Sequence, residues 1–192
     1  MNSPNTSARL HKFILASASP ARADLLRQIG LEFIVFPSKI EEDLIESGDP
    51  IDKVVTLSQA KSRQVARTFK DGIIISADTI VVMEKKILGK PKDEHEAYEI
   101  LNFLSGNHHH VITGITVLDT NTGNYCSSYE TTKVYMKRLS PKIIKAYIKS
   151  GEPTGKAGAY AIQGKGGIFI ERIEGCYFNV VGLPLAKLGN ML

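Results

Sequence analysis

The chain has 192 residues, 43% of them hydrophobic and 23% charged, with a formal net charge of +4. This length suits one domain over residues 1–192 with a sizeable core, and no apolar run is long enough to cross a bilayer. The mild basic excess permits an anionic ligand without requiring nucleic acid. Two isolated cysteines, Cys126 and Cys176, fit a reducing compartment, so we expect a cytoplasmic protein.

The first part of the chain predicts strands and helices in alternation. Residues 1–10 are polar, and we expect them to be disordered. After a first strand, Ser19-Pro20 has the pattern of a helix N-cap followed by proline at the first helical position. Strands are expected at residues 13–17, 33–36 and 73–83, and helices at residues 20–29 and 49–69.

The second part continues this alternation with two long strands at its centre. Strands are expected at residues 87–88, 111–119, 125–137 and 168–171, helices at residues 93–104 and 140–149, and a further segment around residues 183–188. A glycine-rich stretch, residues 155–167, separates the last helix from the last strand. Mixed elements of this kind predict an α/β or α+β fold.

Two charged residues interrupt apolar patterns. Asp78 lies within an apolar run that otherwise predicts burial on both faces, where an unpaired carboxylate is costly. It is either a functional group or an aspartate satisfied by backbone amides. Lys61 shares the apolar stripe of its helix with Val54, Leu57 and Val65. It points either toward a ligand or, with its stem on apolar surface, to water.

Three further positions suggest phosphate and metal chemistry. Arg22 follows a strand, a polar turn and a helix N-terminus, which together can cradle phosphate, although a solvated arginine fits the same pattern. Lys90 lies between a glycine and a proline and either faces a ligand or is solvated. Glu41, Glu42 and Asp43 can supply oxygen ligands to Mg²⁺ or form an exposed loop without metal.

The glycine-rich stretch and a run of histidines are less specific. Residues 155–167 match neither the P-loop nor the Rossmann pattern, but Gln163 within them can hydrogen-bond a base or a phosphate. His108, His109 and His110 cannot easily converge on one ion from a strand, because successive side chains point to opposite faces. We expect these histidines in a loop or at an edge.

The order and spacing of these residues resemble one family, the Maf proteins, also called septum formation inhibitors. The resemblance extends over about residues 12–190. Its matching segments are Leu15 to Leu26, Ile40-Glu-Glu, Lys61, Ala77-Asp-Thr-Ile-Val, Gly89-Lys-Pro, Leu104-Ser-Gly, Thr113-Gly, Gly151-Glu-Pro, Lys156 to Gly164 and Val180 to Leu185.

The resemblance implies an α/β fold similar to that of the inosine-triphosphate pyrophosphatases, with a mixed twisted sheet, flanking helices and two lobes around a cleft. It implies hydrolysis of a nucleoside triphosphate to the monophosphate and pyrophosphate, assisted by Mg²⁺ or Mn²⁺. The segment from Ala159 to Gly164 is similar to that of the branch that acts on dTTP and UTP. A homodimer would also agree with the family.

The roles that we expect combine the resemblance with charge and position. Asp78 is the expected proton acceptor, and Glu42 and Asp78 the metal ligands. The expected clamps on the triphosphate are Arg22, Lys61 and Lys90, with Ser17 as a hydrogen-bonding partner of phosphate. Thr79 and Gln163 are candidates for base recognition. Ala21 occupies a specificity position where the family usually has arginine, which leaves the preferred base open.

Two other functions remain alternatives at this point. A nucleotide-binding regulator of cell division would bind the same ligand with little catalysis. A nucleic-acid-binding protein is less favoured, because carboxylates at the predicted site repel a phosphate backbone and no aromatic residues interleave with the basic ones. We expect neither a nucleic acid nor a membrane as a partner.

Overall fold

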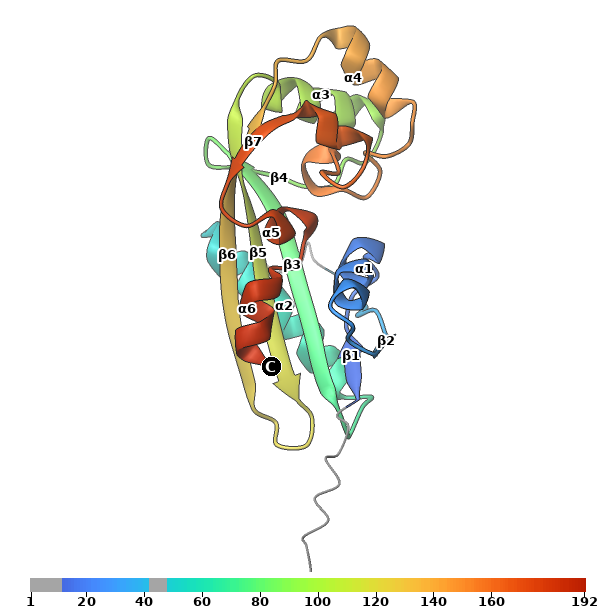
Figure 1. Cartoon of the computed structure of the whole chain (residues 1–192), viewed down its shortest axis with the longest axis vertical. Coiled ribbons are helices and arrows are strands. Elements are labelled where there is room, and N and C mark those ends of the chain that lie inside the picture. Colours follow the sequence, from blue (N-terminus) through green and yellow to red (C-terminus); the bar gives the residue numbers. More distant parts are fainter. Residues whose placement is uncertain (1–11, 42–47) are drawn as a thin grey trace, which may run out of the picture.

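A computed structural model of the chain describes residues 12–41 and 48–192 (Figure 1). The expected disorder of residues 1–10 and the predicted site residue Glu42 therefore lie outside the described residues. The strands are β1 (Phe13–Leu15), β2 (Phe33–Val35), β3 (Ile73–Met83), β4 (Lys86–Leu88), β5 (His108–Asp119), β6 (Tyr125–Met136) and β7 (Ile170–Glu174). The helices are α1 (Pro20–Gln28), α2 (Pro50–Ala66), α3 (Glu94–Leu104), α4 (Pro141–Ile148), α5 (Tyr177–Val181) and α6 (Leu185–Met191), and the 3-10 turns are η2 (Ala157–Ala159) and η3 (Lys165–Phe169).

All seven strands form one mixed sheet, which confirms the predicted α/β class. The strand order is β2-β1-β3-β5-β6-β7, and β4 pairs with β3. β2, β1 and β3 run parallel, whereas β4, β5, β6 and β7 join by antiparallel pairing. In Figure 1, β3, β5 and β6 run from a lower lobe, which contains α1, α2 and α6, to an upper lobe, which contains α3 and α4.

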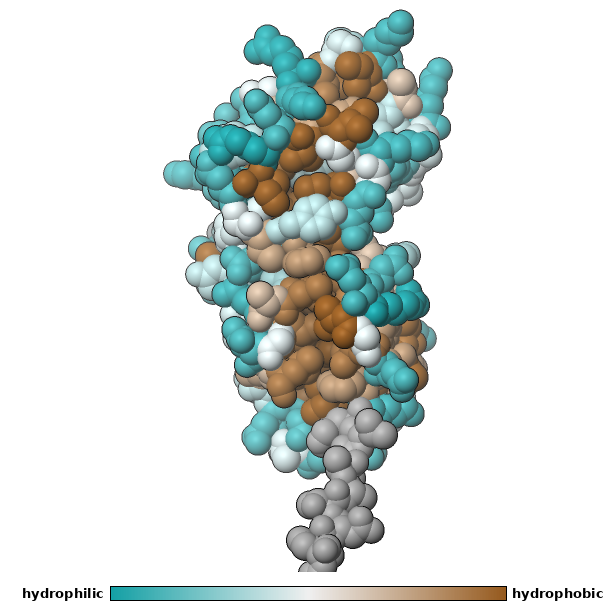
Figure 2. Space-filling model, viewed as in Figure 1, coloured by the Kyte–Doolittle hydropathy of each residue, from teal (hydrophilic) through white to brown (hydrophobic). Residues whose placement is uncertain are grey.

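Two hydrophobic cores lie on the same face of β3, one in each lobe. Ile75 and Ala77 belong to the lower core, which packs against α1 and α6, and Val81 and Met83 belong to the upper core, which packs against α3 and α4. Because alternate residues of a strand share a face, Thr79 lies between the two cores. Figure 2 shows that the surface of the molecule narrows between the lobes. None of the described helices is both long and apolar enough to span a membrane.

The capping signals explain where several helices begin. Asp49 accepts hydrogen bonds from the amides of Ile51 and Asp52 at the start of α2, and Ser140 accepts one from Ile143 at the start of α4. Ser19 is the N-cap of α1, as predicted, but its side chain makes no capping bond. The start of α1 is instead held by hydrogen bonds from the Ser19 amide and the Arg22 side chain to the Ser17 hydroxyl.

The second half of the chain departs from the prediction in three places. The three histidines begin β5 rather than lying in a loop or at an edge, because β5 is an inner strand of the sheet. The last strand begins at Ile170, two residues later than predicted, since residues 165–169 form η3. Residues 177–181, which had no predicted element, form the short helix α5, whose burial depends on contacts with β5 and β6.

The side chains at the start of β5 alternate between a buried and an exposed face. His109 is fully buried, whereas His108 and His110 lie on the opposite, exposed face. The Nε2 atom of His109 lies 2.8 Å from the hydroxyl of Tyr160, and its Nδ1 atom has no hydrogen-bond partner among the described residues. Burial, followed by repulsion from His110 and His108, lowers the pKa of His109 to about 4. The neutral imidazole therefore joins β5 to the glycine-rich stretch.

This buried histidine predicts a loss of stability in acid. Its pKa is about 4 in the folded protein against an ordinary 6.5, so the unfolded chain binds more protons between these values. The free energy of unfolding should fall as the pH drops through this window, by roughly 3 kcal/mol at pH 4. We expect His109→Gln to lack this part of the pH dependence in urea unfolding, and the exposed His95→Gln to retain it. If the free energy of unfolding depended on pH in the same way in both variants, His109 would not be the source of this loss of stability.

Candidate active site

The site lies where the edge of β3 has no strand partner among the described residues. On this edge, β1 pairs with β3 as far as Ile75, and β4 pairs with it from Val81. We call residues 76–80 of β3 the open edge. Asp78 and Thr79 lie at its centre, and their side chains point to opposite faces of the sheet. Groups from both lobes can therefore reach the same short stretch of β3.

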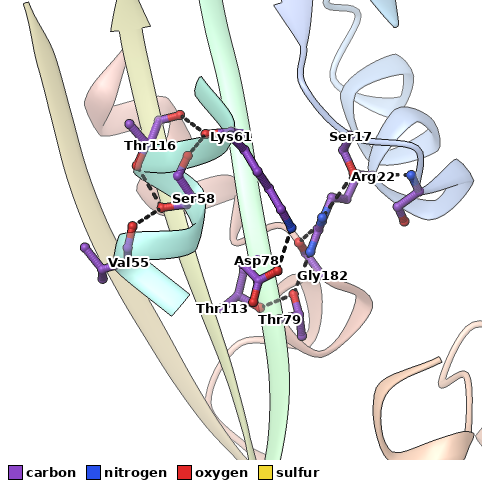
Figure 3. Close-up of polar contacts among 12 residues, drawn as sticks. Ser17, Arg22, Val55, Ser58, Lys61, Asp78, Thr79, Thr113, Thr116 and Gly182 are labelled. Carbon is purple, nitrogen blue, oxygen red and sulfur yellow. Dashed lines mark hydrogen bonds and ion pairs between the residues drawn. The ribbon is translucent and has the colours of Figure 1, made fainter. Parts of the chain in front are cut away.

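Arg22 approaches the open edge from the lower lobe. It extends from the first turn of α1, directly after the turn that follows β1. Its Nε atom donates to the carbonyl of Gly182 at 2.8 Å, and its terminal nitrogens donate to Ser17 at 3.0 Å and to Thr79 at 2.9 Å. Figure 3 shows the guanidinium reaching from α1 toward β3. Three chain segments are thus held in one arrangement by a planar donor.

Further hydroxyl groups extend this network across the sheet. Thr79 contacts Thr113 of β5 through their hydroxyl oxygens at 2.9 Å, and the Thr113 hydroxyl donates to the carbonyl of Asn179 at 3.1 Å. The Ser17 hydroxyl also accepts the amide of Ser19 at 3.2 Å, which fixes the turn before α1. Arg22 is only 9% exposed, so the alternative of a solvated arginine is wrong.

Lys61 and Asp78 form an ion pair on the other face of β3. The Lys61 ammonium lies 2.6 Å from an Asp78 carboxylate oxygen, and both residues are 5% exposed. Figure 3 shows the lysine side chain extending from α2 to the strand. The alternative of a lysine that reaches water is therefore wrong, and so is an Asp78 satisfied by backbone amides alone. The pair thus places a carboxylate and a cation side by side at the open edge.

Close packing of α2 against the sheet makes this pair possible. Gly114, the β5 partner of Asp78, faces the backbone of Val54 so closely that an added Cβ would lie 2.4 Å from its carbonyl group. Ser58 and Thr116 bond through their hydroxyls at 2.8 Å, and Ser76 donates to the carbonyl of Ser58 at 2.7 Å. This polar seam keeps α2 in position beside Asp78.

Lys90 and Gln163 belong to the upper lobe, and both are exposed. Lys90 follows β4 by two residues, and the antiparallel register of β4 directs the chain at this point toward the open edge. The carbonyl of Gly89 accepts the amide of Gly158 at 3.1 Å, which attaches the glycine-rich stretch beside Lys90. Ala21 is half-buried in the first turn of α1, next to Arg22.

The structure thus brings most of the predicted residues to one region of the sheet. Ser17, Arg22 and Thr79 share one hydrogen-bond network, and Lys61 and Asp78 form an ion pair one residue along the same strand. A cavity of about 390 Å³ lies elsewhere, at the lower end of the sheet, and contains none of these residues. Its lining consists of Phe13, Ile73, Val117, Asp119, Asn124, Tyr125, Cys126, Met191 and Leu192.

The donor chemistry fits a hard divalent cation that binds together with a polyphosphate. Within the described ranges, no three His, Cys, Asp or Glu side chains cluster in a way that could hold an ion. Mg²⁺ commonly uses one or two carboxylates and takes its other ligands from water and substrate phosphates. Asp78 provides such a carboxylate beside the hydroxyl network, whereas the histidines do not, since His109 faces away from His108 and His110.

Sequence reasoning missed several residues that build the site. Ser58 and Ser62 lie in the same buried stripe of α2 as Lys61, so helical periodicity could have revealed them. Thr113 and Gly114 formed part of the family resemblance, but without a role. Gly182 also lay within a segment of the resemblance, but its contact with Arg22 could not be inferred, because the two residues are 160 positions apart.

Comparison with known proteins finds sequences that are similar to nearly the whole chain. A model of the family described as Maf-like protein matches residues 12–192. A dTTP/UTP pyrophosphatase of Ruminiclostridium cellulolyticum is 53% identical over 184 residues, which cover 95% of each chain. A second protein of that name, from Methanosarcina barkeri, is 48% identical and covers 95% of this chain and 93% of its own.

Among solved structures, the Staphylococcus aureus Ham1 protein matches 65% of this chain and 71% of its own, with a TM-score of 0.45 and 15% identity. The family model covers the whole open edge of β3, both lobes and every described residue of the predicted site. With relatives about half identical over nearly the same length, the chain belongs to the Maf family.

Proposed function

We propose that this protein hydrolyses dTTP and UTP to the monophosphate and pyrophosphate. The observation that carries the proposal is the convergence of an ion-paired carboxylate, a buried arginine and a row of hydroxyls at the open edge of β3. A cationic and hydroxyl-rich site suits a polyphosphate, and the carboxylate suits a proton acceptor. Relatives that cover nearly the whole chain carry the name dTTP/UTP pyrophosphatase, which supports this substrate class.

In the proposed reaction a water molecule attacks the α-phosphorus. The bond from that phosphorus to the oxygen bridging to the β-phosphorus breaks, and pyrophosphate leaves. Asp78 accepts the proton of the attacking water through its carboxylate. Arg22, Lys61 and Lys90 bind the phosphates and balance their negative charge, and Ser17 donates a hydrogen bond to a phosphate oxygen. Asp78 and Glu42 would hold Mg²⁺ or Mn²⁺, which would supply charge neutralisation and a lowered pKa for water at the site.

The electrostatics of the site support these roles. Asp78 and Lys61 are almost fully buried, so their interactions with a bound phosphate are screened less than those of surface groups. The side chains are already ordered by their mutual contacts, so little reorganisation is needed when charge develops on the phosphate oxygens. Thr79 is held by Arg22 and Thr113, and Gln163 lies on the exposed part of the glycine-rich stretch, from which we propose that it contacts the base.

A panel of nucleotides tests the proposed substrate class. We expect pyrophosphate from dTTP and UTP, at rates well above those from purine nucleoside triphosphates. Ala21→Arg restores the arginine that the family pattern carries, and we expect it to change the ratio of kcat/KM between dTTP and UTP while both remain substrates. If dTTP raises the melting temperature but yields no pyrophosphate under any metal condition, the protein is a nucleotide-binding regulator instead.

A further inference from the structure

The segment that carries Gln163 has little regular structure and depends on side chains for its shape. Between η2 and η3, residues 160–164 belong to no helix or strand. Backbone amides without a hydrogen-bond partner destabilise such a segment, so the groups that accept these amides determine its conformation. One carboxylate and one phenol accept the amide of Ala161 within this segment and the amides of the two residues that follow it, and neither group has a role in the reaction proposed above.

Glu152 binds this segment through both oxygens of its carboxylate. One oxygen accepts the amide of Gly166 at 2.9 Å and the Tyr147 hydroxyl at 2.8 Å, and the other accepts the amide of Lys165 at 2.9 Å. The Tyr147 hydroxyl in turn accepts the amide of Ala161 at 3.2 Å. The chain is therefore bound on both sides of Gln163, at positions 161, 165 and 166.

Two glycines allow the backbone to close over these side chains. A Cβ on Gly164 would lie 2.5 Å from a carboxylate oxygen of Glu152, and a Cβ on Gly166 would lie 2.8 Å from the Tyr147 hydroxyl. Any larger residue at these positions would displace the carboxylate or the phenol. Glu152 and Tyr147 thus explain why glycines occupy positions 164 and 166.

The protonation of both groups agrees with this arrangement. Burial by itself would raise the pKa of Glu152, but the hydrogen bonds from Gly166, Lys165 and Tyr147 outweigh burial and lower it below its ordinary value. Burial, and then the hydrogen bond to Glu152, raises the pKa of the Tyr147 hydroxyl. The carboxylate stays ionised and the phenol stays protonated at neutral pH, so the phenol can donate to Glu152 while it accepts from Ala161.

The other end of the segment is attached beside the open edge of β3. The Gly158 amide binds the Gly89 carbonyl next to Lys90, and a Cβ on Gly158 would lie 2.8 Å from the Val81 side chain. The Tyr160 hydroxyl contacts the buried His109 at 2.8 Å. Gln163 therefore lies between a start that is attached to the sheet and an end that is held by Glu152.

We infer that Glu152 is a positioning residue for nucleotide binding, which acts by holding Gln163 at the rim of the site. This inference rests on the proposed substrate class. Glu152 itself touches no part of the catalytic group around Asp78 in the contacts described above. Its carboxylate instead fixes the backbone that presents the Gln163 amide, and a loosened backbone presents that amide less often to the ligand.

The test compares Glu152→Gln, Gln163→Ala and the double variant. In Glu152→Gln the new amide nitrogen cannot accept a backbone N–H, so one hold on the segment is lost. We expect KM for dTTP to rise about tenfold, the scale for one charge-assisted hydrogen bond, with kcat within about threefold of the unchanged protein. The double variant should have the same KM for dTTP as Gln163→Ala alone, because both changes remove the same contact. Glu171→Gln, an exposed carboxylate of β7, is the matched control.

Two measurements separate this inference from the proposed hydrolysis. The affinity for α,β-imido-dUTP, which is not cut between its α- and β-phosphates, should fall about tenfold in Glu152→Gln even if dTTP yields no pyrophosphate. Hydrogen exchange at the amides of residues 161, 165 and 166 should become faster without ligand. The inference would be overturned if Glu152→Gln left KM and the affinity unchanged, or if the losses in the double variant were additive. It would also be overturned if the protein without substitutions did not bind the analogue.

Discussion

Replacing Asp78 with asparagine is expected to lower kcat for dTTP by about two orders of magnitude or more, the rough scale for the loss of a general base. An amide has nearly the shape of the carboxylate but cannot accept the proton of the attacking water. Because its side chain lies on the opposite face of β3 from Arg22 and Thr79, asparagine should leave their hydrogen-bond network in place. The measurement is initial rates of pyrophosphate release over a range of dTTP concentrations.

The ion pair requires a control for folding. Asparagine removes the carboxylate that lies 2.6 Å from the buried Lys61 ammonium, and breaking a buried pair in this way costs about 3–5 kcal/mol of stability. The double variant Lys61→Met with Asp78→Asn removes both charges and should recover much of that stability without recovering turnover. A single variant with kcat within a few-fold of the unchanged protein would exclude Asp78 as the base.

The location of the site follows from how the two lobes share one sheet. Apolar residues of β3 pack into one core below Thr79 and into another above it, and the polar residues lie between the cores. On the opposite face, Asp78 lies between the apolar clusters around Ile74 and Ile80. A polar interruption that would weaken a single core costs less where two cores meet, because neither has to enclose it.

The sequence predicted the groups that break a pattern better than the contacts that hold them. Asp78 and Lys61 were identified because each interrupts an apolar period, and the structure pairs them across 17 residues. The helix starts at Asp49 and Ser140 were also predicted correctly, since capping depends on neighbouring residues alone. Such features are local, and local chemistry is what a single sequence records most directly.

Features that depend on distant pairing could not be predicted. The open edge exists because β1 ends at Leu15, opposite Ile75, and β4 ends at Leu88, opposite Val81, and no local pattern fixes these end points relative to β3. Helix α5 has five residues, and its burial against β5 and β6 gives it an environment that its own sequence does not indicate. The histidines were misplaced for a related reason, since three polar residues in succession do not indicate an inner strand.

Arg22 combines a role that the sequence predicted with a contact that it did not. Its position after a polar turn at the start of a helix predicted a phosphate-binding group, and its place beside Thr79 is compatible with that role. The same guanidinium also holds the Gly182 carbonyl, a contact with a segment near the other end of the chain. Arginine can serve both purposes because its planar group has several N–H donors in a fixed geometry. Lysine at this position would keep the charge but lose that geometry.

Removal of divalent cations is expected to abolish hydrolysis. With EDTA in excess, pyrophosphate release from dTTP should fall by at least about 100-fold, because the charge of the triphosphate is no longer neutralised and the attacking water is not activated. Addition of Mg²⁺ or Mn²⁺ beyond the chelator should restore the rate. Ca²⁺, which is larger and tolerates less regular coordination, is the comparison ion. Full turnover in the chelator would reject a metal at Asp78 and Glu42.

The free protein should respond to metal much less than the protein with nucleotide. Only two carboxylates, those of Asp78 and Glu42, are proposed to hold the cation, and an ion bound in this way takes its other ligands from phosphate and water. We therefore expect Mn²⁺ alone to leave the melting temperature nearly unchanged, and Mn²⁺ with α,β-imido-dUTP to raise it, as binding to the folded state requires. In Asp78→Asn the joint effect should be much smaller. An equal rise with Mn²⁺ alone would show instead that the protein holds the cation without the nucleotide.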